Sequence, residues 1–466
     1  MPRWALGIML WLAEHGEWVF RLSGGAQGGD FGCMLSIETL VLIGGILLFA
    51  GVVASKLSDW VGIPTLLVFL VIGMLAGDEG IGRISFDSPQ VAQATGTVAL
   101  LIILFAGGLD TQWSSVRSVL APGLMLSTLG VLITTFSMGL FAWFMLGTYS
   151  TFDIGEDGLS WTEALLLAAI VSSTDAAAVF SVFRTSAVKP SARIRHLLEF
   201  ESGSNDPVAV LMTMAILGVM VSNNASIAGV GVNLITELIA GAITGFAMGW
   251  CGTWVVNRLR LSASGLHPIL VLSIGLMTFG FANLVGGNGF LAIYVCGVTL
   301  GNRIVRHHDS VLRFHDALSW LAQLAMFIVL GLLVVPSRLV SVAGVAVAMA
   351  LFLMLVARPL SVMACLLPFR IPRKEVAYVS WVGLRGSVPI VLATFPMSYG
   401  IPGAEEVFDV IFFIVLTSVL IQGLTLVPCA RWLGVAEAEG VAEEKGGTEA
   451  EGVAEEKGVA EEKGGT

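Results

Sequence analysis

Charged residues are scarce in this chain of 466 residues: Asp, Glu, Lys and Arg make up 12% of it, against about 25% in ordinary soluble domains. Apolar residues make up 56%, and the mean hydropathy is +0.88. Apolar stretches of about 20 residues recur along the chain, which is the length of a membrane-spanning helix. The composition excludes an ordinary soluble protein. It predicts an all-α polytopic membrane protein, because lipid cannot satisfy an open backbone.

Cysteine is rare, with five residues that have no close spacing. This spacing argues against a disulfide framework and against a zinc site. We therefore expect no transition-metal site. We also expect no cofactor and no nucleic-acid partner.

The formal net charge of -10 is unevenly distributed, because the ten Glu and three Lys of residues 435–466 contribute a net -7. The acidity belongs to a tail.

Three regions are predicted. Residues 1–33 form an N-terminal extension, which is either an upstream addition with a misassigned start or a signal peptide. Residues 34–432 form the transmembrane domain, and residues 433–466 repeat Gly-Val-Ala-Glu-Glu-Lys and are expected to be disordered. The thirteen predicted spans lie near residues 37–55, 60–77, 94–110, 118–147, 161–183, 196–221, 228–256, 266–285, 288–302, 314–335, 339–367, 375–397 and 406–429.

Basic residues are distributed asymmetrically over the predicted loops. The loops after odd-numbered spans hold fourteen Lys and Arg residues, whereas those after even-numbered spans hold Arg83 and Arg338 alone. Because basic loops stay on the cytoplasmic side, the odd loops and the C-terminus are expected there. We expect the chain in a bacterial inner membrane.

The fifth span contains a polar cluster, Ser172-Ser173-Thr174-Asp175, near its middle. Hydroxyl and carboxylate groups compete for backbone hydrogen bonds, so the cluster predicts a broken or unwound helix. An ionisable residue within a span is a candidate functional residue. The alternative is that these small polar side chains only join neighbouring helices.

The sixth span begins with the polar sequence Phe-Glu-Ser-Gly-Ser-Asn-Asp-Pro at residues 200–207. On a helix, Ser202 and Asp206 share one face, and Glu201 and Asn205 share the adjacent face. The spacing predicts a different task for each face. The alternative is a polar helix end at the membrane surface.

Arg385 lies about ten residues into the twelfth span. A guanidinium there needs a buried anion, and the expected partner is Glu201 or Asp175. Arg358 in the eleventh span either pairs in the same way or extends to the membrane surface. Asp110, at the end of the third span, is either a further ligand or a solvated loop acid.

These groups suit a hard monovalent cation, because oxygen ligands dominate and no thiol or imidazole cluster is present. A carboxylate held away from water resists ionisation, so it can hold either a proton or a cation. Exchange then requires a site that opens to each side in turn. Two alternatives stay open: a cation channel, and an intramembrane aspartyl protease that uses Asp175 and Asp206 as a dyad.

The segments Ala-Gly-Gly-Leu-Asp-Thr (residues 106–111) and Leu-Pro-Phe-Arg (residues 367–370) resemble the potassium/proton branch, which regulates cell volume, of the NhaP-type monovalent cation:proton antiporter-1 family. Four motifs together resemble the family as a whole. They are Thr174-Asp175, the 201–207 segment, Gly383-Leu384-Arg385-Gly386, and Gly289-Phe290-Leu291-Ala292 with Gly301-Asn302. The resemblance extends over residues 34–432. It implies an antiporter of K+ or Na+ against H+ that serves pH and volume homeostasis and is not an enzyme, with thirteen helices in two inverted repeats and a homodimeric assembly.

The resemblance also implies roles for individual residues. Asp206 would be the carboxylate shared by proton and cation, with Thr174 and Ser202 as further ligands and Ser173 as a candidate. Asp175 would compensate the charge of helix ends at the break. Glu201 would pair with Arg385 and position Asn205. Because the residue before Asp206 is Asn205 rather than a second aspartate, one proton is expected per cation.

Overall fold

The computed structural model describes residues 37–61, 64–148, 159–184, 186, 188–221, 227–263, 265–304 and 307–438. The predicted N-terminal extension lies outside the described residues. The chain divides into two units, residues 1–47 and 48–466. The described part of the first unit is the opening of one helix, and everything discussed below belongs to the second.

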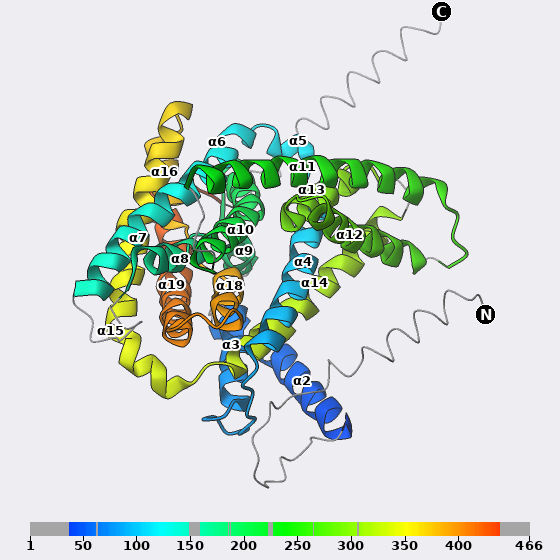
Figure 1. The fold of residues 1–466 in the computed structure, drawn as a ribbon. Helices are drawn as coiled ribbons and strands as arrows, with labels where there is room; N and C mark the ends of the chain where they lie inside the picture. Colours follow the sequence, from blue (N-terminus) through cyan, green and yellow to red (C-terminus); the bar gives the residue numbers. More distant parts are fainter. Residues whose placement is uncertain are drawn as a thin grey trace, which may run out of the picture. The chain divides into compact units, whose positions relative to one another are not determined.

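Helices make up nearly all of the described chain (Figure 1). The first half contains α2 (Ile37–Val61), α3 (Thr65–Ala76), α4 (Pro89–Asp110), α5 (Trp113–Val116), α6 (Leu120–Met125), the π-helical turn η2 (Leu126–Gly130), α7 (Val131–Thr148), α8 (Trp161–Ile170), α9 (Ala176–Arg184) and α10 (Ala192–Val221). The second half contains α11 (Ile227–Arg258), α12 (Leu266–Leu284), α13 (Gly289–Gly301), α14 (His308–Leu332), α15 (Pro336–Phe352), the π-helical turn η3 (Leu353–Ala357), α16 (Arg358–Leu366), the short 3-10 helix η4 (Leu367–Phe369), α17 (Arg373–Trp381), α18 (Ser387–Ser398) and α19 (Ala404–Leu433).

The predicted membrane spans agree with these helices. Eight helical stretches of the described residues are long and apolar enough to cross a membrane, and shorter apolar helices accompany them. Each predicted span overlaps at least one of these helices. The chain is therefore a multi-pass membrane protein, as the composition predicts, while the number of crossings stays a prediction.

Local sequence signals explain where several helices begin. Ser160 and Glu163 form a capping box at the start of α8, in which each side chain accepts a hydrogen bond from the other residue's backbone N–H. Ser88 caps α4 by accepting from the backbone N–H of Val91 at 3.4 Å. Such caps satisfy N–H groups that have no partner within the helix.

Two stretches repeat the same order of elements. Each begins with a helix interrupted by a π-helical turn (α6–η2–α7 and α15–η3–α16), continues with a broken helix (α8/α9 and α17/α18), and ends with a 30-residue helix (α10 and α19). The first stretch follows an odd-numbered loop and the second an even-numbered one, so the positive-inside pattern orients them oppositely. These are the inverted repeats with broken helices that the family resemblance implies.

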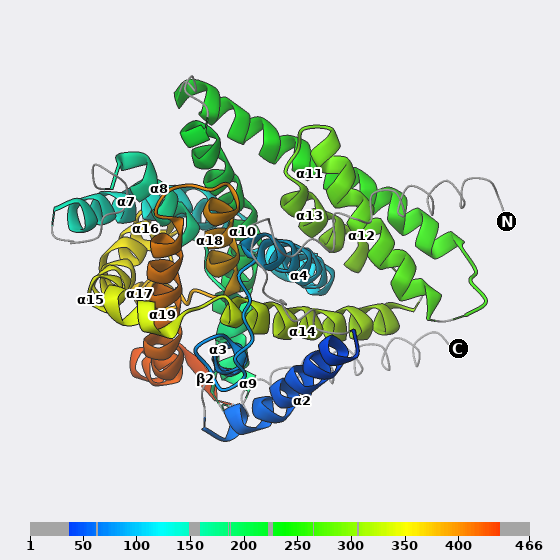
Figure 2. The same cartoon turned by 60° about the horizontal axis from the view of Figure 1, so that its bottom comes forward.

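The helices of the second unit form two groups of neighbours. α4 packs against α13 and α14, and α13 packs against α11 and α12. In the other group, α8 contacts α7, α10 and α18, while α19 contacts α15 and α18. The views in Figures 1 and 2 show α11, α12 and α13 side by side, with α10 and α18 near α4. The most buried segments are α8, α18 and the middle of α10, so the core surrounds the broken helices.

A short antiparallel strand pair involves the residues around the start of the predicted tail. The short strand β2 (Ala436–Ala438) pairs antiparallel with β1 (Val188–Pro190), and Glu437 lies opposite Lys189. The tail is predicted to start at residue 433; in the structure α19 extends to that residue, and β2 follows it. Backbone pairing with a distant strand cannot be recognised in a sequence that is rich in Ala and Glu. The residues after 438 lie outside the described part.

Small residues allow α4 and α13 to pack closely. A Cβ atom added to Gly297 would lie 2.7 Å from the carbonyl oxygen of Phe105, and one on Gly301 would lie 2.0 Å from that of Leu109. Membrane helices associate through such close contacts because lipid supplies no hydrophobic drive between them.

We predict that Gly297→Ala destabilises the protein by about 1–3 kcal/mol, because a methyl group there overlaps backbone of α4. Gly280→Ala is the matched control, since a Cβ on Gly280 meets nothing within 4 Å. Thermal unfolding in detergent should show a lower midpoint for Gly297→Ala alone. Equal midpoints would show that this contact does not constrain the fold.

Candidate functional site

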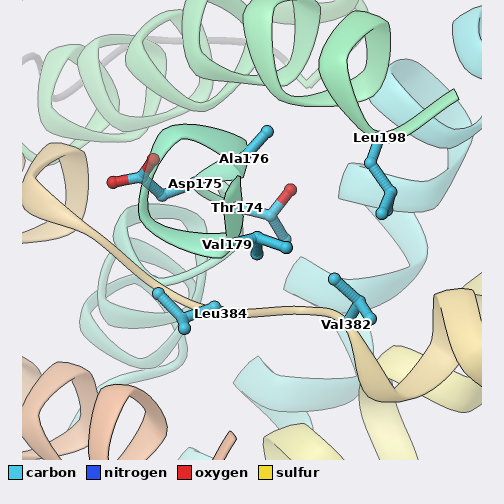
Figure 3. A pocket seen from close by; sticks show the side chains of 7 residues that line it. All are labelled: Thr174, Asp175, Ala176, Val179, Leu198, Val382 and Leu384. Atoms are coloured by element: carbon cyan, nitrogen blue, oxygen red, sulfur yellow. The ribbon is translucent and has the colours of Figure 1, made fainter. Parts of the chain in front are cut away.

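The two broken helices cross at their unwound segments. Residues 171–175 separate α8 from α9, and residues 382–386 separate α17 from α18. The backbone N–H of Asp175 donates to the carbonyl of Leu384 at 2.8 Å, which joins the two segments directly. Figure 3 shows Thr174 and Asp175 beside the extended segment that contains Val382 and Leu384. The sequence predicted the first break.

Arg385 neutralises the end of α8. Its side chain is 1% exposed, and Nη1 donates to the backbone carbonyls of Ser172 at 2.5 Å and Ser173 at 2.6 Å. These carbonyls follow the C-terminus of α8, where a positive charge is favourable. The predicted pairing of Arg385 with Glu201 is wrong, because unwinding frees backbone carbonyls that supply the acceptors.

Asp175 lies at the N-termini of two helices. Its Oδ1 accepts from the backbone N–H of Ala178 at 3.0 Å, in the first turn of α9. A Cβ atom on Gly386 would lie 1.8 Å from Asp175 Oδ2, so the carboxylate also reaches the start of α18. A negative charge is favourable at helix N-termini. The absence of a side chain at Gly386 thus allows the approach of the Asp175 carboxylate.

Side chains of α10 hold the first break in place. The hydroxyl of Ser202 donates to the carbonyl of Thr174 at 2.9 Å and accepts from the N–H of Ala176 at 3.0 Å. Asn205 Nδ2 donates to Thr174 Oγ1 at 2.7 Å. The helical spacing placed Ser202 and Asn205 on two adjacent faces with different tasks. Ser202 and Asn205, three residues apart, act on the same segment.

Asp206 follows Asn205 and carries the unsatisfied carboxylate of the site. It is 8% exposed, and its Oδ1 has no hydrogen-bond partner among the described residues. Ser173, which is 1% exposed, lies close by without meeting hydrogen-bond geometry, and the Asp175 carboxylate is within electrostatic range. A buried oxygen without a partner is costly, so Asp206 has capacity for a further ligand.

Glu201 pairs with Arg358, the residue whose role the sequence left open. Arg358 Nη1 donates to Glu201 Oε1, and Nη2 donates to Oε2 at 2.9 Å. Both residues are buried, and Arg358 Nη2 also approaches the carbonyl of Val382 at 3.3 Å. A Cβ on Gly383 would lie 3.0 Å from Arg358 Cγ. The pair therefore connects α10 and α16 to the second break.

Two buried residues of α19 were missed in the sequence. The Ser418 hydroxyl accepts from the backbone N–H of Arg385 at 3.1 Å and donates to Gln422 Oε1 at 2.6 Å. Gln422 Nε2 in turn donates to the carbonyl of Trp381 at 2.7 Å. Both side chains satisfy backbone groups freed by the second break. Their signal was present as two polar residues four apart in an apolar span.

A small pocket adjoins the crossing, with about 180 Å³ of free space including its mouth. Apart from Thr174 and Asp175, its lining is apolar: Ala176, Val179, Leu198, Val382 and Leu384. In Figure 3 the Asp175 carboxylate points away from Leu198 and Val382. Within the described residues, no three His, Cys, Asp or Glu side chains cluster as a metal site.

Asp110 is not part of the crossing. It is exposed at the last residue of α4, within electrostatic range of Glu199 on α10. Asn302, from the Gly301-Asn302 motif, contacts the residues that follow the C-terminus of α4. Its Nδ2 donates to the carbonyl of Thr111 at 2.8 Å, and its Oδ1 accepts from the backbone N–H of Trp113 at 2.8 Å. Asn302 thus fastens the turn after α4 to α13.

The sequence resembles known transporters over most of its length. The profile of the family described as "Sodium/hydrogen exchanger, transmembrane" matches residues 34–432. The "K(+)/H(+) antiporter NhaP" of Alkalimonas amylolytica is 42% identical over 400 residues, which are 86% of this chain and 68% of that protein. The "K(+)/H(+) antiporter NhaP2" of Shewanella sp. (strain ANA-3) is 42% identical over 399 residues, 85% of this chain and 67% of that protein.

A solved structure has the same fold. The sodium proton antiporter MjNhaP1 from Methanocaldococcus jannaschii, determined at pH 8, aligns with a TM-score of 0.73 at 23% sequence identity. The alignment covers 85% of this chain and 100% of that one.

We predict a strong energetic coupling between Glu201 and Arg358. Arg358→Ala should cost about 3–5 kcal/mol, because it leaves a buried carboxylate without its partner. The double variant Glu201→Ala/Arg358→Ala should be more stable than the sum of the two single costs implies, as measured by thermal unfolding in detergent. Additive costs would mean that the two charges do not interact as the contact indicates.

Proposed function

Because the chain belongs to the transmembrane sodium/hydrogen exchanger family, a family of transporters and not of enzymes, we propose that it exchanges K+ or Na+ for H+ across the membrane. The 42% identical relatives are named for potassium, and a 28% identical one from Methanocaldococcus jannaschii is named "Probable Na(+)/H(+) antiporter 2". Counterflow measured with each alkali cation at several pH values identifies the cation. The transported ions are the substrates, and no cofactor takes part.

The observation that carries this proposal is the unsatisfied carboxylate oxygen of Asp206. It lies on α10 one residue after Asn205 and four after Ser202, the two side chains that hold Thr174 in the first break. Each hydroxyl retains a lone pair beyond its present hydrogen bonds, and such oxygens suit a hard monovalent cation. We assign Asp206, Ser202 and Thr174 as ligands, with Ser173 as a candidate.

Competition at Asp206 couples the two ions. Either a proton or an alkali cation neutralises the single negative charge of the buried Asp206 carboxylate. Because one positive charge is enough, the site favours one of the two ions at a time. Asn205 is neutral and is engaged with Thr174, so it adds no second charge. We infer an electroneutral exchange of one proton for one cation.

The surrounding charges keep the site in place. Asp175 faces the positive ends of α9 and α18, while Arg385 faces the negative end of α8, so both compensate helix ends that the breaks leave inside the membrane. The Glu201–Arg358 pair positions α10. These four residues organise the site, and Asp206 carries the exchange.

The arrangement of basic loops supports an inner-membrane location with the C-terminus in the cytoplasm. Family membership supports a homodimer that serves pH and cell-volume homeostasis. The channel and protease alternatives are not favoured by any contact at the crossing. In particular, Asp175 Oδ1 accepts from the backbone N–H of Ala178 and so caps α9.

We predict that Asp206→Asn abolishes cation-driven proton flux in proteoliposomes, because an amide can neither release a proton nor neutralise a cation. Its volume is conserved, so folding should be retained in size-exclusion chromatography. Asp409→Asn is the matched control: Asp409 is also buried, at 2% exposed, but lies on α19 within 3.2 Å of Arg338. It should retain flux. Normal exchange by Asp206→Asn would refute the mechanism.

A further inference from the structure

Tyr294 is a buried tyrosine that the exchange mechanism above does not use. It lies in the middle of α13 and is 4% exposed. Its ring end lies directly over α10: a Cβ atom on Gly203 would be 2.7 Å from Cε2, 2.8 Å from Cζ and 2.9 Å from the hydroxyl oxygen of Tyr294. The absence of a side chain at Gly203 is what allows the phenol to reach this helix.

The contact lies one turn from the proposed ligand. Gly203 follows Ser202 and precedes Asp206 by three residues, a separation of about 4.5 Å along a helix. Tyr294 is within electrostatic range of Asp206. The phenol is on the Ala192 side of Asp206, which is the side that the basic loop before α10 places in the cytoplasm.

The hydroxyl of Tyr294 has no hydrogen-bond partner among the described residues, although it is buried. The hydroxyls of Thr111 and Ser204 lie nearby without meeting hydrogen-bond geometry. An unsatisfied buried hydroxyl is costly, and such groups are commonly satisfied by water or an ion. The phenol therefore has one open position facing a set of hydroxyls between α4, α10 and α13.

Acidic residues lie at the outer end of this set. Asp110, beside Thr111, is exposed at the end of α4, and Glu199 is exposed on α10. Glu199 is within electrostatic range of both Asp110 and Tyr294. Exposed carboxylates raise the local concentration of cations around them. The order from solvent inward is thus carboxylates, hydroxyls with Tyr294 among them, and then Asp206.

We propose that Tyr294 is a binding residue for the transported cation, and that its hydroxyl contacts the partly hydrated ion on its way between the cytoplasm and Asp206. This inference rests on the proposed function. The phenol replaces part of the hydration shell, so that the cation does not lose its water in one step. Asp110 serves the entrance of this path rather than the ligand shell.

The test compares Tyr294→Phe with Tyr378→Phe in proteoliposomes. Tyr294→Phe keeps the ring over Gly203 and removes the one oxygen. It should raise the KM for the cation about three- to tenfold, the equivalent of one hydrogen bond, with a smaller change in maximal rate. Tyr378 on α17 is equally buried and its hydroxyl is also unsatisfied, so Tyr378→Phe should leave KM unchanged.

The outcomes separate the two proposals. If the wild-type protein exchanges ions and Tyr294→Phe has the wild-type KM, the role of Tyr294 is refuted and the exchange mechanism stands. If both tyrosine variants raise KM equally, the effect is structural and the inference also fails. If the wild-type protein shows no exchange with K+ or Na+, the proposed function itself fails.

Discussion

The structure depends on how it satisfies the charged and polar ends of two helices that are broken inside a membrane. Lipid offers no hydrogen bonds, so the carbonyls and N–H groups freed at each break need partners within the protein. Arg385 supplies donors for the carbonyls after α8, Asp175 faces the starts of α9 and α18, and Ser418 with Gln422 satisfies the second break. Each break is stabilised by groups from outside its own helix, which makes the crossing an assembly of four helices.

The same constraint explains why the site is chemically suited to ions. Once the breaks are satisfied, Asp206 remains with an oxygen that no described residue engages. Next to it, Ser202 and Asn205 hold Thr174 so that its hydroxyl stays at a fixed position. A rigid frame with one unsatisfied carboxylate is the arrangement that permits binding without rebuilding the fold. The Glu201–Arg358 pair is buried and joins α10 to α16. Both carboxylate oxygens of Glu201 accept from Arg358, so we do not assign Glu201 as a ligand of the transported ion.

Much of this could be predicted from the sequence, because the membrane restricts the choices. Apolar stretches of about 20 residues predicted the spans, and the hydroxyl-rich cluster predicted the break in the fifth span. The family resemblance identified Asp206 as the candidate ion ligand. The partner of Glu201 could not be predicted, since Arg358 and Arg385 are equally cationic and only the unwinding at residues 382–386 decides which of them reaches a carboxylate. Ser418 and Gln422 were missed for the same reason: their partners are backbone groups that become free only in the folded state. The β1–β2 pair depends on a long-range contact that carries no local signal.

The central claim is that a proton and an alkali cation exclude each other at Asp206. The direct measurement is the apparent affinity of the purified protein for the cation at a series of pH values, read by isothermal titration calorimetry together with the protons released on binding. If the two ions compete, the affinity for the cation falls about tenfold for each unit by which the pH is lowered, in the range where the site is protonated. In that range close to one proton is released for each cation bound. Affinity that is independent of pH, with no proton released between pH 5 and 9, would contradict the account.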